Sequence, residues 1–143
     1  METPAAIFIG GDMKRVLITP EANAMLAMLQ EKHGRLMFHQ SGGCCDGSAP
    51  MCYPRNEFRV GQNDVFLGWV GEEPNSTPFY ISGPQFEYWK HTELTLDIVP
   101  GRGSGFSVEA PEGFRFLIRS RVFTDDEWNF LKDEQVLTGS QHE

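Results

Sequence analysis

The sequence predicts an α+β domain in which one amphipathic helix packs on a twisted, mostly antiparallel β-sheet or sandwich. A single clear helix signal lies near the N-terminus, and most of the remaining chain consists of short apolar runs separated by glycine and proline. The chain has 143 residues, 40% of them hydrophobic and 22% charged, which is typical of one globular domain. We place this domain at residues 14–136 and expect residues 1–13 and 137–143 to be flexible termini.

The clearest predicted element is a helix over residues 20–33, preceded by a short strand at residues 16–18. Thr19 supplies an N-cap hydroxyl and Pro20 takes the first helical position, where its missing N–H costs nothing. Gly34 is expected to end the helix. Apolar residues recur at helical spacing and form one face: Ala22, Met25, Leu26 and Leu29.

Later segments predict strands, either by alternation of apolar and polar residues or by short apolar runs bounded by turn residues. The expected strands span residues 36–39, 64–70, 78–81, 94–99, 106–109 and 114–123. A helical turn is expected at residues 85–90. A short C-terminal helix over about residues 125–136 is indicated by Thr124 and Glu127, which have the spacing of a capping box.

The charge and hydropathy of the chain exclude several classes of partner. The formal net charge is −8, which should repel a phosphate backbone, so no nucleic-acid partner is expected. No run of 18 apolar residues is present, so we expect no membrane span. The N-terminus has no basic region followed by an apolar one, so we expect no secretory signal and a cytoplasmic location.

The cysteines are the main functional signal, because all three lie within nine positions: Cys44, Cys45 and Cys52. An odd number of thiols cannot pair fully within one chain, and in a reducing compartment such a cluster favours metal binding or thiol chemistry. Zinc takes about four ligands. The three thiolates could supply three of them, and His39 or His91 the fourth. The expected cofactor is zinc or iron, the latter also as an iron–sulfur cluster.

Two other interpretations stay open. In the first, the protein is a small enzyme or redox protein in which Cys44 or Cys45 is the nucleophile and His39 the base, acting on aldehydes or thiols. In the second, the thiols are buried without chemical function, and the chain is an interaction protein. A non-enzymatic role is favoured over catalysis.

Three segments have long and unusual sequences: LMFHQSGGCCDG at residues 36–47, PMCYP at residues 50–54 and QFEYWKHT at residues 85–92. With them, the chain resembles a small bacterial family of unknown function that is commonly encoded beside aldehyde dehydrogenases. The resemblance covers about residues 14–123. It implies an accessory role in aldehyde or alcohol oxidation with an aldehyde dehydrogenase as partner, and it leaves a homo-oligomer open.

A second resemblance is to the HesB/IscA-type iron–sulfur carriers. They also have a strand, a threonine-capped helix and a strand that enters a Gly-Gly-Cys loop, as residues 42–47 do here. This likeness implies a HesB-like fold. The carriers end in a Cys-Gly-Cys pair, whereas this chain has no cysteine after Cys52, so Cys45 and Cys52 would have to take the place of that pair.

Overall fold

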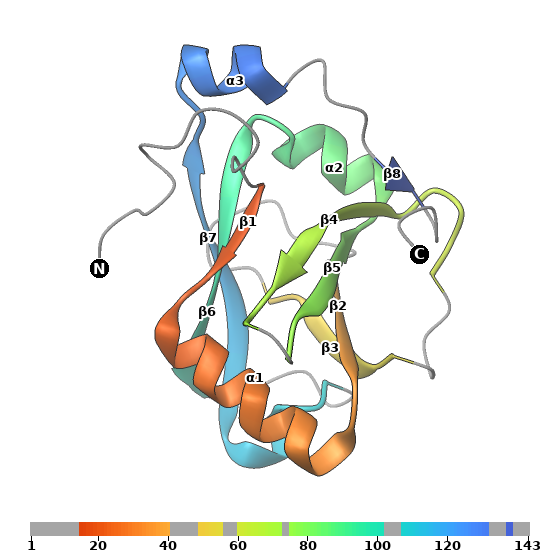
Figure 1. The fold of residues 1–143 in the computed structure, drawn as a ribbon, viewed down its shortest axis with the longest axis vertical. Helices are drawn as coiled ribbons and strands as arrows, with labels where there is room; N and C mark the ends of the chain where they lie inside the picture. Colours follow the sequence, from red (N-terminus) through yellow and green to blue (C-terminus); the bar gives the residue numbers. More distant parts are fainter. Residues whose placement is uncertain are drawn as a thin grey trace.

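The computed structural model describes residues 15–40, 49–55, 60–72, 75–101, 107–131 and 137–138. Over these residues it is an α+β fold of two mixed β-sheets and three α-helices (Figure 1). The elements in chain order are β1 (Val16–Ile18), α1 (Pro20–His33), β2 (Leu36–Gln40), β3 (Met51–Pro54), β4 (Val65–Val70), β5 (Thr77–Ile81), α2 (Gly83–Trp89), β6 (Thr92–Pro100), the 3₁₀ turn η2 (Ala110–Glu112), β7 (Phe114–Val122), α3 (Asp125–Leu131) and β8 (Leu137–Thr138).

The smaller sheet has the strand order β1-β6-β7 and the larger sheet has the order β3-β2-β5-β4-β8. Each contains one parallel pairing, β1 with β6 and β2 with β5. The other four pairings among the described residues are antiparallel. The predicted α+β class is confirmed, but the sheets are mixed. Residue alternation reports which face of a strand is buried and not its direction, so the parallel pairings could not be predicted from it.

Helix α1 has the predicted bounds and both predicted ends. The Thr19 hydroxyl accepts a hydrogen bond from the Ala22 N–H at 3.1 Å. The N–H of Gly34 donates to the carbonyl of Gln30 at 2.9 Å, and Gly34 has φ of +83°, a conformation that favours glycine. In the predicted apolar face, Ala22, Leu26 and Leu29 are fully buried and Met25 is partly buried. No described helix is long and apolar enough to cross a membrane.

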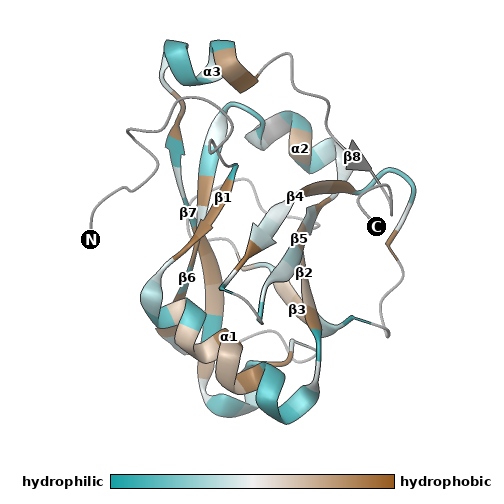
Figure 2. Ribbon diagram, in the orientation of Figure 1, coloured by the Kyte–Doolittle hydropathy of each residue, from teal (hydrophilic) through white to brown (hydrophobic). Residues whose placement is uncertain are grey.

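The hydrophobic core lies between the two sheets and under α1 (Figure 1). Phe38 of β2 stacks on Phe79 of β5 and meets Phe116 of β7 edge-on, with ring centroids 4.9 Å apart in the second pair. From β6, Leu94 and Leu96 point into the same core, as their alternation predicts. Figure 2 shows apolar colouring along the strands and more polar colouring on the exposed parts of the helices.

The C-terminal helix α3 begins with the predicted capping box. The Thr124 hydroxyl accepts from the Glu127 N–H at 3.2 Å, and the Glu127 carboxylate accepts from the Thr124 N–H at 2.8 Å. Arg121 of β7 binds the same carboxylate at 2.9 Å and also binds Glu93 of β6 at 3.1 Å. These contacts hold the pKa of Glu127 at about 2, while burial raises the pKa of Glu93. One arginine thus joins both strands to α3.

Three segments differ from the prediction. Residues 107–109 form a turn rather than the expected strand, because their side chains bind backbone N–H groups of other strands. Strand β3 was not predicted, since its four residues include a proline. Strand β8 pairs with β4, although it lies in the segment expected to be a flexible terminus. Helix α3 is described to Leu131, and the rest of the predicted helix lies outside the described residues.

Candidate functional site

The segment that contains Cys44 and Cys45 begins and ends at one end of the larger sheet. Residues 41–48 lie outside the described residues, but the strands on both sides are described. Strands β2 and β3 are antiparallel, and His39 of β2 pairs with Met51 of β3. The described chain therefore enters and leaves the cysteine segment at the same end of the larger sheet.

His39 lies at this end and is held by a carboxylate. Its Nε2 is 3.0 Å from Oδ1 of Asp64, and the two side chains are only 8% and 15% exposed. The other carboxylate oxygen of Asp64 accepts a hydrogen bond from the N–H of Gly61 at 2.8 Å. A carboxylate at this distance from an imidazole nitrogen is the kind of partner that orients histidine in many metal sites and catalytic dyads.

The surroundings of this pair are built from regular elements. The carbonyl of Gln40 accepts from the Ser82 N–H at 3.1 Å, and Ser82 caps helix α2. A Cβ on Gly83, the first residue of α2, would lie 2.9 Å from the carbonyl oxygen of Asn63. Only glycine fits there without a shift, because the turn that carries Asp64 lies directly against the helix. The ends of β2 and β5 and the start of α2 thus meet around the His39–Asp64 pair.

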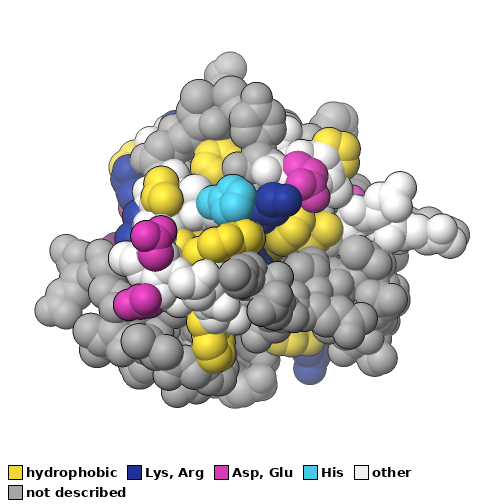
Figure 3. Space-filling model, turned by 90° about the horizontal axis from the view of Figure 1, so that it is seen from above, with side chains coloured by type: hydrophobic (Ala, Val, Ile, Leu, Met, Phe, Trp, Pro, Cys, Tyr) yellow, Lys and Arg dark blue, Asp and Glu magenta, His cyan; other side chains and the backbone are white. Residues whose placement is uncertain are grey.

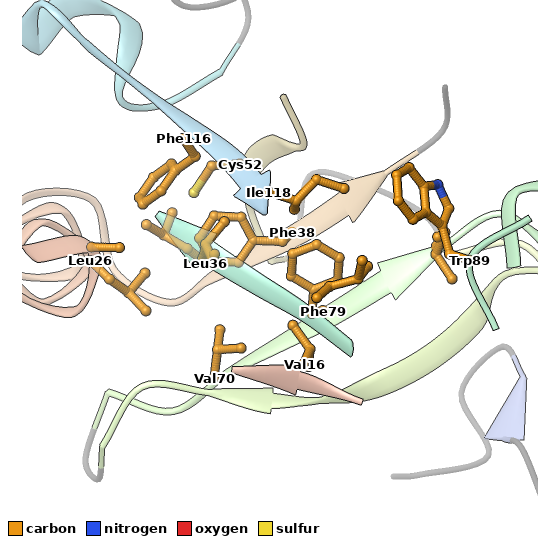
Figure 4. Packing of buried hydrophobic residues seen from close by; sticks show 14 of the residues in the cluster. Val16, Leu26, Leu36, Phe38, Cys52, Val70, Phe79, Trp89, Phe116 and Ile118 are labelled. Atoms are coloured by element: carbon orange, nitrogen blue, oxygen red, sulfur yellow. The ribbon is translucent and has the colours of Figure 1, made fainter. Parts of the chain in front are cut away.

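Cys52 lies on the opposite face of the same sheet. It pairs with Phe38, one position from the His39–Met51 pair, and successive strand residues point to opposite faces. Both Cys52 and Phe38 are fully buried in the core, where the sulfur lies between Leu36 and Phe116 (Figure 4). Burial raises the pKa of the Cys52 thiol well above its usual value, and the charge of Glu109 raises it further. The thiol is therefore protonated at neutral pH.

The backbone of Cys52 is held by a hydrogen-bond network of buried polar side chains. The Cys52 N–H donates to the hydroxyl of Ser107 at 2.8 Å, and this hydroxyl donates to the carboxylate of Glu109. The same carboxylate accepts from the Phe116 N–H at 3.1 Å. Ser107 and Glu109 are 2% and 1% exposed. This network joins β3 of one sheet to β7 of the other, which is a structural role.

His91, the second predicted histidine ligand, lies at the far end of α2 from the His39 site. Helix α2 has seven residues, which corresponds to about 10 Å of helix. The His91 ring is exposed and lies 4.3 Å from the ring of Trp128 in α3, centroid to centroid. The face seen from above carries a histidine beside a Lys or Arg and among hydrophobic side chains (Figure 3). The structure thus separates His91 from His39.

Among the described residues, no three His, Cys, Asp or Glu side chains come together as a metal site. His39 and Asp64 are brought together, Cys52 and His91 are placed elsewhere, and Cys44 and Cys45 lie outside the described part. The sequence reasoning missed Asp64, which it placed in a strand. The Gly61-Gln62-Asn63-Asp64 turn was the available signal, since aspartate after such a turn binds backbone N–H groups.

One comparison with known proteins gives a match. A family described as a domain of unknown function, DUF779, matches residues 25–122. The matched region includes the cysteine segment, His39 and Asp64, and all elements from β2 to β7. Neither the curated proteins nor the solved structures gave a match. Because the match covers more than half of the chain, this protein belongs to the DUF779 family.

Proposed function

We propose that the end of the larger sheet around His39 and Asp64, with the cysteine segment at residues 41–48, is the functional site of this protein. It binds zinc or iron through Cys44, Cys45 and His39, and the protein serves as a cytoplasmic accessory protein in aldehyde or alcohol oxidation. The observation that supports this proposal is the buried His39–Asp64 pair, 3.0 Å apart, where β2 enters the cysteine segment.

The residues present fit a soft metal ion. Thiolate and imidazole are preferred ligands of zinc and iron, and metal-binding histidines usually contact a carboxylate with their other nitrogen. Three protein ligands leave a fourth coordination position for solvent or for a ligand from a partner protein. The thiolates could also hold iron as an iron–sulfur cluster. Cys52 is left out of this ligand set because its thiol faces the core. His91 is left out because it lies beyond α2 and packs on Trp128.

Elemental analysis and an absorption spectrum of the anaerobically purified full chain, without a metal-binding tag, test the site. We expect about one metal ion per chain, bound by the two thiolates and the imidazole. The Cys44→Ser/Cys45→Ser variant should lose the ion, and Asp64→Asn should weaken its binding by about tenfold or more. Cys52→Ala is the matched control and should keep it. A folded, metal-free wild type, or full metal content in the double variant, would refute the site.

A second candidate function is supported by the same pair. A histidine oriented by an aspartate is the arrangement that activates nucleophilic thiols. Cys44 or Cys45 would add to the carbonyl carbon of an aldehyde, which gives a hemithioacetal and needs no oxidant. Iodoacetamide should then label one of these thiols rapidly at neutral pH, and His39→Gln and Asp64→Asn should slow the labelling. Labelling at the rate of a free thiol of pKa about 8.5 would contradict this function.

The aldehyde dehydrogenase as partner and the HesB-like fold both rest on sequence resemblance. We propose the dehydrogenase as the direct partner, and co-purification of the two full-length proteins tests it. If the dehydrogenase binds the wild type and the Cys44→Ser/Cys45→Ser variant equally, the site is not needed for assembly, as expected of a pure interaction protein. If it binds neither, the partner assignment is wrong.

A further inference from the structure

A second site is indicated by a basic hollow at the C-terminal end of α1. The hollow has a volume of about 460 Å³ and is lined by His33, Gly34, Arg35 and Arg55. A volume of this size is within the range of small-molecule sites, about 300–1,000 Å³. The chain as a whole has a net charge of −8, so the basic lining of the hollow has a charge opposite in sign to that of the whole protein. Among the described lining residues there is no carboxylate.

The two arginines are direct neighbours on adjacent strands. The Arg55 N–H donates to the Arg35 carbonyl at 2.9 Å, which extends the β2–β3 ladder by one position beyond the Leu36–Pro54 pair. Like charges directly opposite each other in a ladder destabilise the sheet. A bound anion beside the two side chains would add a charge of opposite sign at this point of the ladder.

The walls of the hollow are held in place by other contacts. The Arg55 guanidinium donates to the carbonyls of Leu36 and Ser76, at 3.3 and 3.4 Å, and lies 5.7 Å from the ring centre of Trp69. The Gln30 side chain joins α1 to β2 and to the β4–β5 turn, because it accepts from the Leu36 N–H and donates to a carbonyl in that turn. A site with fixed walls loses little conformational entropy when it binds a ligand.

We propose that this hollow binds a small anion, a carboxylate or a phosphate, through Arg35, Arg55 and His33. The exposed Arg35 guanidinium matches both anions because it can donate two parallel hydrogen bonds to paired oxygens, and Arg55, whose Nε and one Nη donate to carbonyls, contributes its positive charge. This inference does not depend on the proposed metal site, which lies at the opposite end of β2.

Calorimetric titration of the full-length protein with sodium phosphate and with sodium malonate, at constant ionic strength in chloride, tests the proposal. We expect saturable binding of at least one of the two, with a dissociation constant of about 1 mM or tighter. Arg35→Gln should weaken it by about tenfold or more, because a charge-assisted hydrogen bond is lost. The tighter-binding anion identifies the ligand class.

Lys32→Gln is the matched control. It removes the same charge one helix position from His33, but Lys32 binds Glu112 at 2.8 Å and does not line the hollow. It should change the affinity by less than about twofold, as expected of an exposed charge. Arg35 and Lys32 are both exposed, so both variants should fold. Absence of saturable binding for both anions, or equal weakening in the two variants, would overturn the proposal.

Discussion

Replacement of Cys52 by alanine tests whether this thiol is part of the hydrophobic core or a metal ligand. The Cys52 side chain is 0% exposed and packs in the core beside Leu36 and Phe116. Loss of the sulfur removes about one methylene equivalent of buried surface, roughly 0.8 kcal/mol, and leaves a small cavity that adds a similar amount. We therefore expect Cys52→Ala to lower the free energy of unfolding by about 1–2 kcal/mol and to leave metal content unchanged.

The same variant should change the pH dependence of stability. The pKa of the Cys52 thiol is raised well above its usual 9.0 in the folded chain, first by burial and then by Glu109. Above pH 9 the unfolded chain loses a proton that the folded chain keeps. The stability that this thiol contributes is thus fully present below pH 9 and falls by up to about 1.4 kcal/mol per pH unit above it. The cost of Cys52→Ala should shrink over this range.

Urea unfolding of the wild type and the variant, followed by circular dichroism, measures both effects near pH 7 and pH 10. The other titrating groups, including Cys44 and Cys45, are the same in both proteins and cancel in the difference. An equal cost at both pH values would show that the thiol does not stay protonated in the folded chain. Loss of the bound metal in Cys52→Ala would show that this thiol is a ligand. Either result would refute the division of the cysteines between core and site.

Three other predictions concern the stability of the fold. Arg121→Met should lower the free energy of unfolding by about 3–5 kcal/mol, because Glu93 and Glu127 are then buried without a counter-charge; a loss below about 1 kcal/mol in urea would contradict this. The pKa of Glu127 is lowered to about 2, so its contribution is present above the unfolded value of 4.5 and is lost as the pH falls toward about 2. As the pH falls below 4.5, the free energy of unfolding should therefore decrease more steeply in the wild type than in Glu127→Gln. In that variant only the Glu93 carboxylate remains of the two, and its raised pKa changes the stability in the opposite direction. Thr19→Ala should cost about 1 kcal/mol, because it removes the N-cap of α1, while Thr19→Ser should restore most of this stability in thermal unfolding.

The elements that were predicted well are those with strong local signals. Helix α1 was predicted with its bounds because Thr19, Pro20 and Gly34 act on the backbone next to them. The capping box of α3 is local in the same way, since Thr124 and Glu127 are three residues apart. Strand β3 was missed because its four residues include a proline, and β8 because its pairing depends on β4, which lies far earlier in the sequence. For β8, two residues without alternation contain no signal by themselves.

The candidate site could be predicted only in part. That His39 lies just before the cysteine segment follows from the sequence itself, and its joint action with Cys44 and Cys45 stays a prediction. The partner of His39 could not be predicted, since Asp64 is 25 positions away and reaches it through the pairing of β2, β5 and β4. The basic hollow was missed for the same reason, because Arg35 and Arg55 become neighbours only when β3 pairs with β2.

The register of β2 and β3 decides which cysteines can act with His39. A shift of one residue would turn Cys52 toward the face of His39 and place Met51 in the core, because side chains alternate with a period of two. The hydrogen bonds of Cys52 oppose this shift, since its N–H donates to the Ser107 hydroxyl at 2.8 Å and its carbonyl accepts from the Val108 N–H at 2.9 Å. Of the three clustered cysteines, the described part of the structure thus places Cys52 in the core. One thiol stabilises the sheet packing, and Cys44 and Cys45 are left for the chemistry proposed at His39.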